Sequence, residues 1–423
     1  MAVDHSLLPE NTPAAIKPPS KRLWAIVFII LAAAIAVAIV WLWPTAVAVS
    51  PWRFWTTITL FPIGVPLWIV LRRFSVHEGK LLDSAMRAEA ARAYNQQVFD
   101  AASRPMHLLG SAFRISFSDE PNSISRINAG DIKLACEETP AGDPRRARWI
   151  DIPVHGITAH DEDDTARQAA LAHWMFDGLL RDLSTTLHGL PRSEDVEVML
   201  WIDSALKPDV VETVWRDCWK RHLRQGMHIA HDKAPKGLSI LDKWLDQMIE
   251  GKTCSARLVV AVQMYPIHTE SPPQGSSEAA VALLLVTDTF ASKYGTNTGI
   301  QVHRPVRGAQ KEAGEALAHA AQWGSVSCKQ ISQVWQTASN GAPTGSWLKF
   351  AHQLGPSADV TNLDKAVGYA GVAAPWLVLA CGAQSVAAGA NSCIVHAEDH
   401  DGLDIAVIKA RSGVHEMRHG KTL

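Results

Sequence analysis

The stretch LSILDKWLDQMIEGKTCSARLVVAVQ, residues 238–263, carries the clearest fold signal in this chain of 423 residues. Its first half spaces apolar residues as a helix does, Gly251 ends that helix, and residues 256–262 form a short apolar run. A second apolar run, EAAVALLLVT, follows at residues 278–287. A strand that is apolar on both faces is buried on both faces, so this stretch predicts a sheet between layers of helices.

The same alternation extends along the chain in both directions. Helical spacing is seen at residues 165–187, 210–224, 311–321 and 364–383, and short apolar runs at residues 106–117, 196–202, 332–338, 391–396 and 404–409. Helices interleaved with apolar strands predict an α/β architecture whose sheets are covered on both faces.

Two long apolar segments precede this region. Residues 23–43 and 54–71 contain no charged side chain, and each is long enough as a helix to cross about 30 Å of hydrocarbon. A signal peptide would have a shorter apolar core, and a buried hairpin of a soluble core is the alternative that the length disfavours. Pro62 and Pro66 are tolerated in membrane helices and predict a kink.

Basic residues flank both segments. Lys17, Lys21 and Arg22 precede the first, Arg72 and Arg73 follow the second, and the connection holds Arg53. The excess of positive charge on the outer flanks predicts that both chain ends face the cytoplasm. We therefore expect a disordered, proline-containing tail at residues 1–21, a transmembrane helical hairpin at residues 22–73 and a connecting helix at residues 74–104.

Composition excludes several functions. The 40 Lys and Arg residues nearly balance the 42 Asp and Glu residues, so the chain lacks the basic field of a dedicated nucleic-acid binder. Its six cysteines are widely spaced without a CxxC pair, which favours buried thiols over a zinc site or a disulfide framework.

Two histidine-containing clusters were weighed as metal sites. His228, His231 and Asp232 have ligand spacing but no evident third ligand, so exposed histidines are favoured. Residues 396–401, HAEDHD, are better interpreted as a charged hairpin turn. No phosphate-binding, nucleotide-binding or HExxH motif occurs in the sequence. We therefore predict no metal and no cofactor.

Four segments resemble the β-ketoacyl synthase and thiolase superfamily. They are residues 238–263, GSSEAAVALLLVTD at 275–288, VTNLDKAVGYAGVAAPWLVLACGA at 360–383 and NSCIVH at 391–396. The resemblance covers about the last three quarters of the chain. It implies a thiolase-like layered fold, with a first half at residues 105–298 and a second half at residues 299–423.

The same resemblance implies a lost active site. The superfamily's nucleophilic cysteine precedes the helix that begins here near Leu238, but residues 230–237, AHDKAPKG, contain no cysteine. Its Gly-His turn matches Gly368 and Tyr369, and its other histidine would fall within residues 336–345, which contain none. We therefore expect a pseudoenzyme without catalytic residues.

In overall layout the chain is similar to the type VI secretion lipase adaptor family, and HLLGSAFRI at residues 107–115 and VEVMLWID at residues 196–203 contribute to that resemblance. It implies a bacterial inner-membrane protein with two spans and a cytoplasmic soluble region. Its implied function is to bind a phospholipase effector and to deliver it to the spike protein of the secretion apparatus.

Two alternatives remain at this point. One is a membrane-associated enzyme that processes acyl or lipid substrates with an unrecognised site around Tyr369 and His396. The other is a membrane-bound scaffold in a different pathway.

Partner binding is predicted on exposed loops, because the sheets are covered by helices. The candidates are the basic loop at residues 140–148, with Arg145, Arg146 and Arg148, and residues 264–275, where Pro272 and Pro273 restrict the chain.

Overall fold

The structure is a computed structural model that describes residues 7–43, 51–119, 122–139, 142, 144–152, 163–191, 196–223, 226–230, 237–249, 256–295, 299–309, 312–338, 358–399 and 402–411. The chain divides into two compact units. The smaller comprises Asp4–Phe99, and the larger comprises Asp100–Leu423 together with Met1–Val3.

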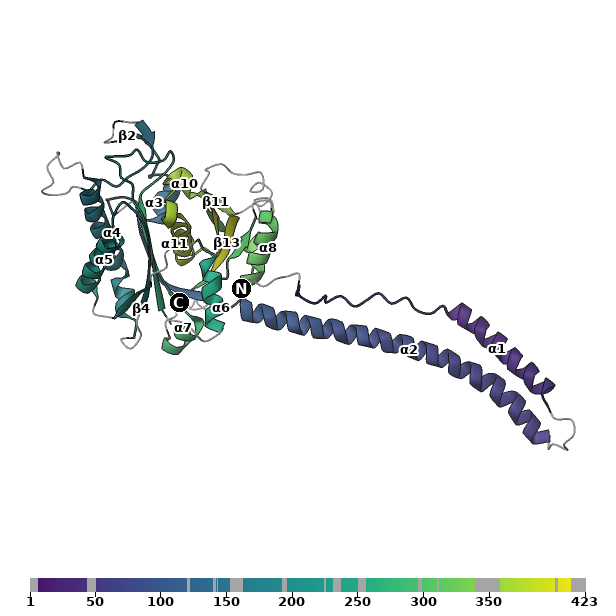
Figure 1. The fold of residues 1–423 in the computed structure, drawn as a ribbon. Helices are drawn as coiled ribbons and strands as arrows, with labels where there is room; N and C mark the ends of the chain where they lie inside the picture. Colours follow the sequence, from purple (N-terminus) through teal and green to yellow (C-terminus); the bar gives the residue numbers. More distant parts are fainter. Residues whose placement is uncertain are drawn as a thin grey trace, which may run out of the picture. The chain divides into compact units, whose positions relative to one another are not determined.

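The smaller unit contains two long helices, α1 (Lys21–Trp41) and α2 (Pro51–Ala102) (Figure 1). Both are long and apolar enough to cross a membrane, with mean hydropathies of 3.1 and 1.7 over their most apolar windows. The side chain of Ser20 caps α1 by accepting a hydrogen bond from the backbone N–H of Leu23.

The second span and the connecting helix predicted at residues 74–104 form one continuous helix of 52 residues, because no proline follows Pro66 before its end and Gly79 alone does not stop a helix. The part of the tail that the structure describes, residues 7–20, is extended and attached to α2, since Asn95 Nδ2 donates to the Pro9 carbonyl at 3.0 Å.

The larger unit is built on one eleven-stranded sheet. Its strands are β1 (Met106–Arg114), β4 (Val196–Asp203), β5 (Met227–Ala230), β6 (Ala256–Gln263), β7 (Ala279–Val286), β8 (Ile300–Val302), β9 (Val306–Gly308), β10 (Gln333–Ala338), β11 (Asp359–Asn362), β12 (Ser392–Asp399) and β13 (Gly402–Ala410). The spatial order is β11-β10-β12-β13-β8-β1-β7-β6-β4-β5, and β9 pairs with β13.

This order contains an internal repeat. In the first half-sheet β5, β4 and β6 are parallel and β7 runs antiparallel between β6 and β1. In the second half-sheet β11, β10 and β12 are parallel and β13 runs antiparallel between β12 and β8. Antiparallel pairing of β1 with β8 joins the halves. The larger unit is therefore two copies of one topology.

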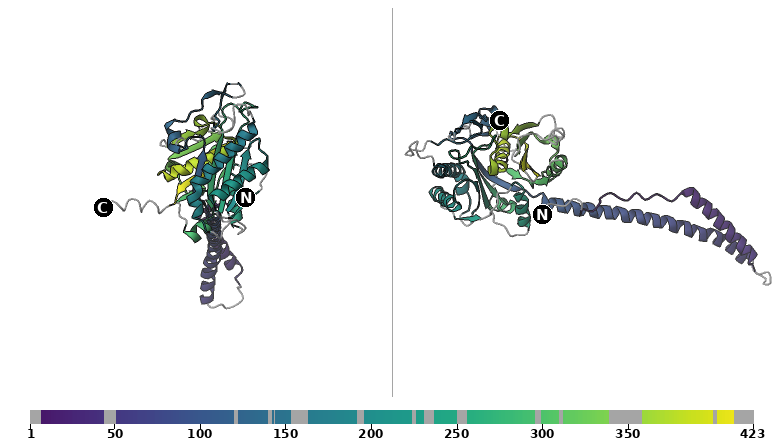
Figure 2. Two further views of the ribbon diagram at one scale, coloured as in Figure 1. Left: turned by 90° about the vertical axis from the view of Figure 1, so that its left-hand side faces the viewer. Right: turned by 45° about the horizontal axis from the view of Figure 1, so that its top comes forward.

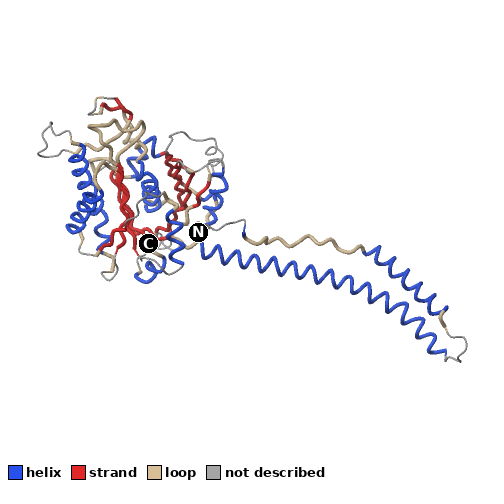
Figure 3. Tube along the Cα trace, viewed as in Figure 1, coloured by secondary structure: helices blue, strands red, loops and turns tan. Residues whose placement is uncertain are grey.

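Helices cover both half-sheets. On the outside of the first lie α4 (Asp164–His188) and α5 (Pro208–His222), and on the outside of the second lies α8 (Ala313–Trp323). The two half-sheets enclose α6 (Ile240–Ile249) and α11 (Ala374–Ala387), which occupy equivalent places in the repeat (Figures 1 and 2). The predicted α/β architecture with covered sheets is confirmed, and Figure 3 shows the helices between the strands.

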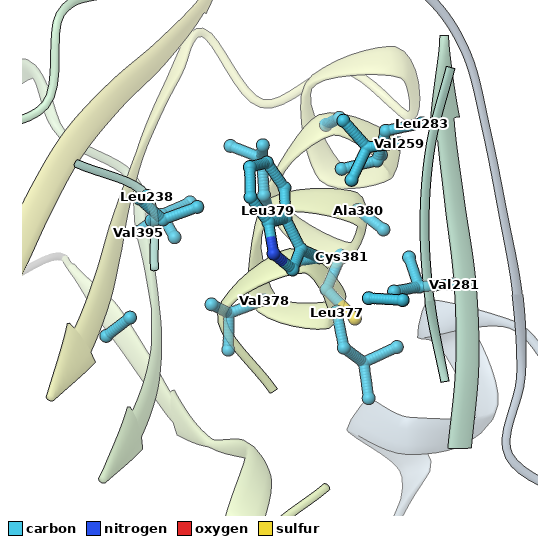
Figure 4. Packing of buried hydrophobic residues seen from close by; sticks show 14 of the residues in the cluster. Leu238, Val259, Val281, Leu283, Leu377, Val378, Leu379, Ala380, Cys381 and Val395 are labelled. Carbon is cyan, nitrogen blue, oxygen red and sulfur yellow. The ribbon is translucent and has the colours of Figure 1, made fainter. Parts of the chain in front are cut away.

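The centre of the core is α11, whose side chains from Trp376 to Ala383 are buried all round. Figure 4 shows Leu377 and Ala380 among Val259, Val281 and Leu283 of the first half-sheet, while Val395 approaches from the second. Because its small and branched residues meet a sheet on each side, α11 has no polar face.

One local prediction was wrong. The helix predicted at residues 364–383 is α10 (Leu363–Ala366) and α11, separated by a turn in which Gly368 has φ of 103°. A residue with that φ cannot continue a right-handed helix. Residues 227–230, for which the sequence pattern predicts no strand, form β5, which extends the sheet beside β4.

Candidate functional site

Three segments that are far apart in sequence lie side by side in the larger unit. Gly275 N–H donates to the Arg146 carbonyl at 2.7 Å, Arg148 N–H to Ser276 at 3.0 Å and Glu278 N–H to Arg148 at 2.9 Å. On the other side Tyr369 N–H donates to Gly275 at 2.8 Å and Ser277 N–H to Tyr369 at 2.9 Å. We call residues 144–148, 272–278 and 368–369 the three-segment platform.

A buried ion pair holds the base of this platform. Glu278 has no exposed side-chain surface, and its carboxylate accepts from both terminal nitrogens of Arg167, at 3.0 and 2.7 Å. It also accepts from the backbone N–H groups of Ile150 and Tyr265, each at 2.9 Å. Four hydrogen bonds satisfy the carboxylate, so the segments around it are fixed to α4.

The predicted binding arginines lie on the platform, but not in an irregular loop. Residues 144–146 form β3, which pairs with β2 (Cys136–Glu138), and this pairing sets Arg145 opposite Glu137. Arg146 is exposed, whereas Arg148 is half-buried and burial lowers its pKa although Glu137 acts to raise it. The predicted basic loop thus contains a short strand, and the facing glutamates offset part of its charge.

The structure describes the remaining residues of the two predicted binding loops only in part. Residues 140, 141 and 143 lie outside the described residues. Pro272 is buried and Pro273 is exposed. The two predicted binding loops are thus joined by backbone hydrogen bonds, and no local sequence pattern indicates that pairing.

The turn at Gly368 and Tyr369 requires its glycine. A Cβ atom at residue 368 would lie 2.9 Å from the Ser276 carbonyl oxygen, and Ser277 Oγ donates to the Gly368 carbonyl at 2.9 Å. This contact sets Tyr369, half-exposed, beside Ser276. Nearby, burial raises the pKa of Tyr265 to about 12, so that phenol is a hydrogen-bond donor and not a base near neutral pH.

The start of α6 is where the superfamily resemblance places a nucleophile. Here Ser239 N–H donates to Asp404 Oδ2 at 2.9 Å, and Arg307 donates to Ser239 Oγ at 3.2 Å. Asp404 is 4% exposed and its carboxylate lies 3.8 Å from Arg307. A carboxylate of the chain itself therefore occupies the helix N-terminus, which elsewhere stabilises a thiolate or an oxyanion. Residues 231–236 lie outside the described residues.

The end of β10 is where the resemblance places a histidine. Thr337 Oγ1 and Ala338 N–H both donate to Asp364, each at 2.6 Å. Burial raises the pKa of Asp364 to about 6, although these hydrogen bonds act to lower it. Within residues 336–345 the structure describes 336–338 alone.

Three indole rings fill the space between the enclosed helices and β4. Trp376 of α11 stacks on Trp201 of β4 with ring centroids 5.0 Å apart, and Trp244 of α6 lies 6.4 Å from Trp376. The guanidinium of Arg257 lies 4.8 Å from the centre of the Trp244 ring. The stack was not predicted, because its members come from three separate elements.

The structure describes only part of each histidine-containing cluster. His228 is exposed on β5, while residues 231 and 232 lie outside the described residues. His396 is not in a turn but inside β12, where burial lowers the pKa of its imidazole to about 4. Within the described ranges, no group of His, Cys, Asp and Glu side chains is arranged to hold a metal ion.

No family model matches the chain, and no curated protein matches it. Among solved structures, the ishigamide ketosynthase/chain length factor is similar over 73% of this chain and 100% of its own, with 15% identity and a TM-score of 0.45. Human mitochondrial 3-ketoacyl-CoA thiolase in complex with CoA is similar over 74% and 99%, with 10% identity and a TM-score of 0.43.

A third structure is the ketosynthase from module 1 of the bacillaene synthase of Bacillus amyloliquefaciens FZB42, similar over 74% of this chain and 77% of its own, with 11% identity and a TM-score of 0.48. The layered α/β fold of the larger unit is shown by its own sheet order and enclosed helices.

Proposed function

We propose that the chain is a membrane-anchored, non-catalytic adaptor that uses a thiolase-like fold as a protein-binding surface. The observation that carries the proposal is the state of the α6 N-terminus. Asp404 accepts the Ser239 N–H at 2.9 Å, so this site already contains a carboxylate. The Ser239 N–H is therefore already engaged and is not available to stabilise an incoming acyl oxyanion.

Three buried thiols also argue against acyl transfer at their positions. Burial raises the pKa of Cys218 to about 11 and raises the pKa values of Cys381 and Cys393 further. Such thiols are protonated near neutral pH, and the thiolate is the nucleophile. Tyr369 stands where the superfamily has a histidine, and a tyrosine cannot supply a cation.

The three-segment platform is the proposed recognition surface. Its backbone is fixed by hydrogen bonds and by the buried Glu278–Arg167 pair, so little order has to be gained on binding. It offers Arg146, Pro273 and Tyr369 to solvent in whole or in part. Arginine and tyrosine are the residue types that contribute most at protein interfaces.

Anchoring is proposed through α1 and α2, and the charge of their flanks supports a cytoplasmic location for both chain ends. The partners come from the resemblance to type VI secretion lipase adaptors: a phospholipase effector, which the soluble region would hold, and the spike protein, to which it would deliver the effector.

Co-expression tests this function. The tagged full-length chain is co-expressed with a candidate type VI phospholipase effector and a spike protein from the same genome, and it is purified from membranes. We expect both to be retained, and we expect no acylated cysteine by mass spectrometry after incubation with an acyl-CoA. Retention of neither protein contradicts the adaptor, and one acyl group per chain favours the alternative of an acyl-processing enzyme.

A further inference from the structure

Beyond its apolar part, α2 continues with a stripe of small and apolar residues. They recur at alternating steps of three and four residues: Phe74, His77, Leu81, Ser84, Ala88, Ala91, Asn95 and Val98. We call these residues the α2 seam. Steps of three and four are the spacing at which two helices pack along a common line. Within the seam Ala88 is 3% exposed and Ala91 is 8% exposed, whereas Ala90 and Ala93 beside them are exposed.

The extended tail occupies part of this face. Asn95 Nδ2 donates to the Pro9 carbonyl, and Leu8, Ile16 and Pro19 of the tail are half-buried. From Pro9 to the start of α1 at Lys21 an extended chain spans about 37 Å. The stretch of α2 from Arg72 to Asn95 is about 35 Å long, which is close to the length of the extended tail. The tail is therefore long enough to follow the seam to the apolar part of α2.

The tail leaves one buried group of the seam unsatisfied. Asn95 is 7% exposed, and its Oδ1 has no hydrogen-bond partner among the described residues. A buried carbonyl oxygen without a partner costs about 1–3 kcal/mol. The tail carbonyl can accept from Asn95 but cannot donate to it, so a second donor has to come from elsewhere.

We propose that the α2 seam is a self-association interface, at which two copies of the chain pair their α2 helices in parallel. In a parallel pair equivalent positions face each other, so Asn95 of each copy can donate to Asn95 Oδ1 of the other. A single buried asparagine of this kind fixes the register of two-stranded coiled coils. Ala88 and Ala91 allow the backbones to approach closely, and Arg87 beside them is paired with Asp83 at 2.9 Å.

The parallel orientation rests on the proposed anchoring, because copies inserted from the same side point their α2 helices the same way. The tail, residues 7–20, covers in the single chain the face that a second copy covers in the pair. Removal of the tail should therefore favour pairing.

Disulfide cross-linking in membranes tests the seam. In a chain with Cys136→Ser, Cys254→Ser and Cys328→Ser, which keeps only the buried native cysteines, one cysteine is introduced by Ala88→Cys or Ala91→Cys in the seam, and by Ala90→Cys or Ala93→Cys as matched controls. After mild oxidation we expect a several-fold higher yield of linked dimer from the seam positions. Deleting residues 2–16, which keeps Lys17, Lys21 and Arg22, should raise the seam yield further and leave the controls unchanged.

Equal yields at seam and control positions in both chain lengths would overturn the proposal. Alkaline extraction of the same membranes separates it from the proposed function. Chains that resist extraction but form no seam cross-link contradict self-association alone, while chains that are extracted contradict the anchoring and the parallel pairing together.

Discussion

Glycines of the three-segment platform differ in what surrounds them. Gly275 and Gly368 both have positive φ, 80° and 103°, but a Cβ atom meets nothing within 4 Å at Gly275 and meets the Ser276 carbonyl at 2.9 Å at Gly368. Gly275→Ala should therefore cost only the backbone strain of about 1–2 kcal/mol. Gly368→Ala should cost more, because the Tyr369 turn must also move. Thermal unfolding of both variants checks this, and equal losses would contradict the clash.

Buried histidines should make stability depend on pH. Burial lowers the pKa values of His396 and His303 to about 4. In the unfolded chain an imidazole titrates near 6.5, so between about 6.5 and about 4 the unfolded state binds more protons. The free energy of unfolding should therefore be highest above about pH 6.5 and should decrease as the pH falls from about 6.5 to about 4. Urea unfolding at pH 7.5 and 5 measures the loss, which His396→Gln should reduce.

Asp364 acts in the opposite direction within part of that range. Its pKa is raised to about 6, so the folded state binds the additional proton between about 4 and about 6. Stability from this group is present at low pH and is lost as the pH rises. Asp364→Asn should therefore steepen the fall in stability toward acid pH, and a flatter profile would contradict the burial of the carboxyl.

At the scale of elements, the β2–β3 ribbon presents the arginines of the platform. Replacing Arg145, Arg146 and Arg148 by Ala leaves their backbone hydrogen bonds in place, so unfolding should change by less than about 2 kcal/mol in total. Retention of the effector should weaken in a salt-dependent way. Arg216→Ala with Lys220→Ala, on the exposed face of α5, is the control. Unchanged retention by the triple variant would remove the ribbon from the interface.

At the scale of the whole molecule, the hairpin should determine on which side of the membrane the larger unit lies. Five basic residues flank the outer ends of the two apolar segments and one lies in their connection, so both ends should be cytoplasmic. A reporter active only in the cytoplasm, fused after Leu423, should give signal. The changes Arg72→Glu, Arg73→Glu and Thr45→Lys transfer positive charge from the outer flank to the connection, and together they should reduce the reporter signal. Signal from a reporter active only outside the cytoplasm would contradict the topology and the access of a cytoplasmic effector.

Local patterns in the sequence were sufficient to predict the two apolar helices, most of the long helices and strands in their order, and the covered sheet. Such features depend on the spacing of side chains within one segment. In residues 256–263 and 374–387, for example, the apolar run alone indicates that the segment is buried. The spacing of residues 364–383 predicted one helix across Gly368, because both flanks are helical in composition, whereas the superfamily resemblance implied a turn there.

Only the tertiary structure determined the contacts between segments that are distant in sequence. The repeat is completed by pairing β1 with β8, Asp404 reaches Ser239 across 165 positions, and the platform joins residues 146, 275 and 369. Each of these contacts is a backbone hydrogen bond or an interaction of a buried charge. No sequence spacing identifies the partner, because any strand edge or backbone N–H group can form such a bond. The physical reason is that the hydrophobicity of a segment determines whether it is buried. Which distant segment it contacts depends on how the sheet and helices pack around α11.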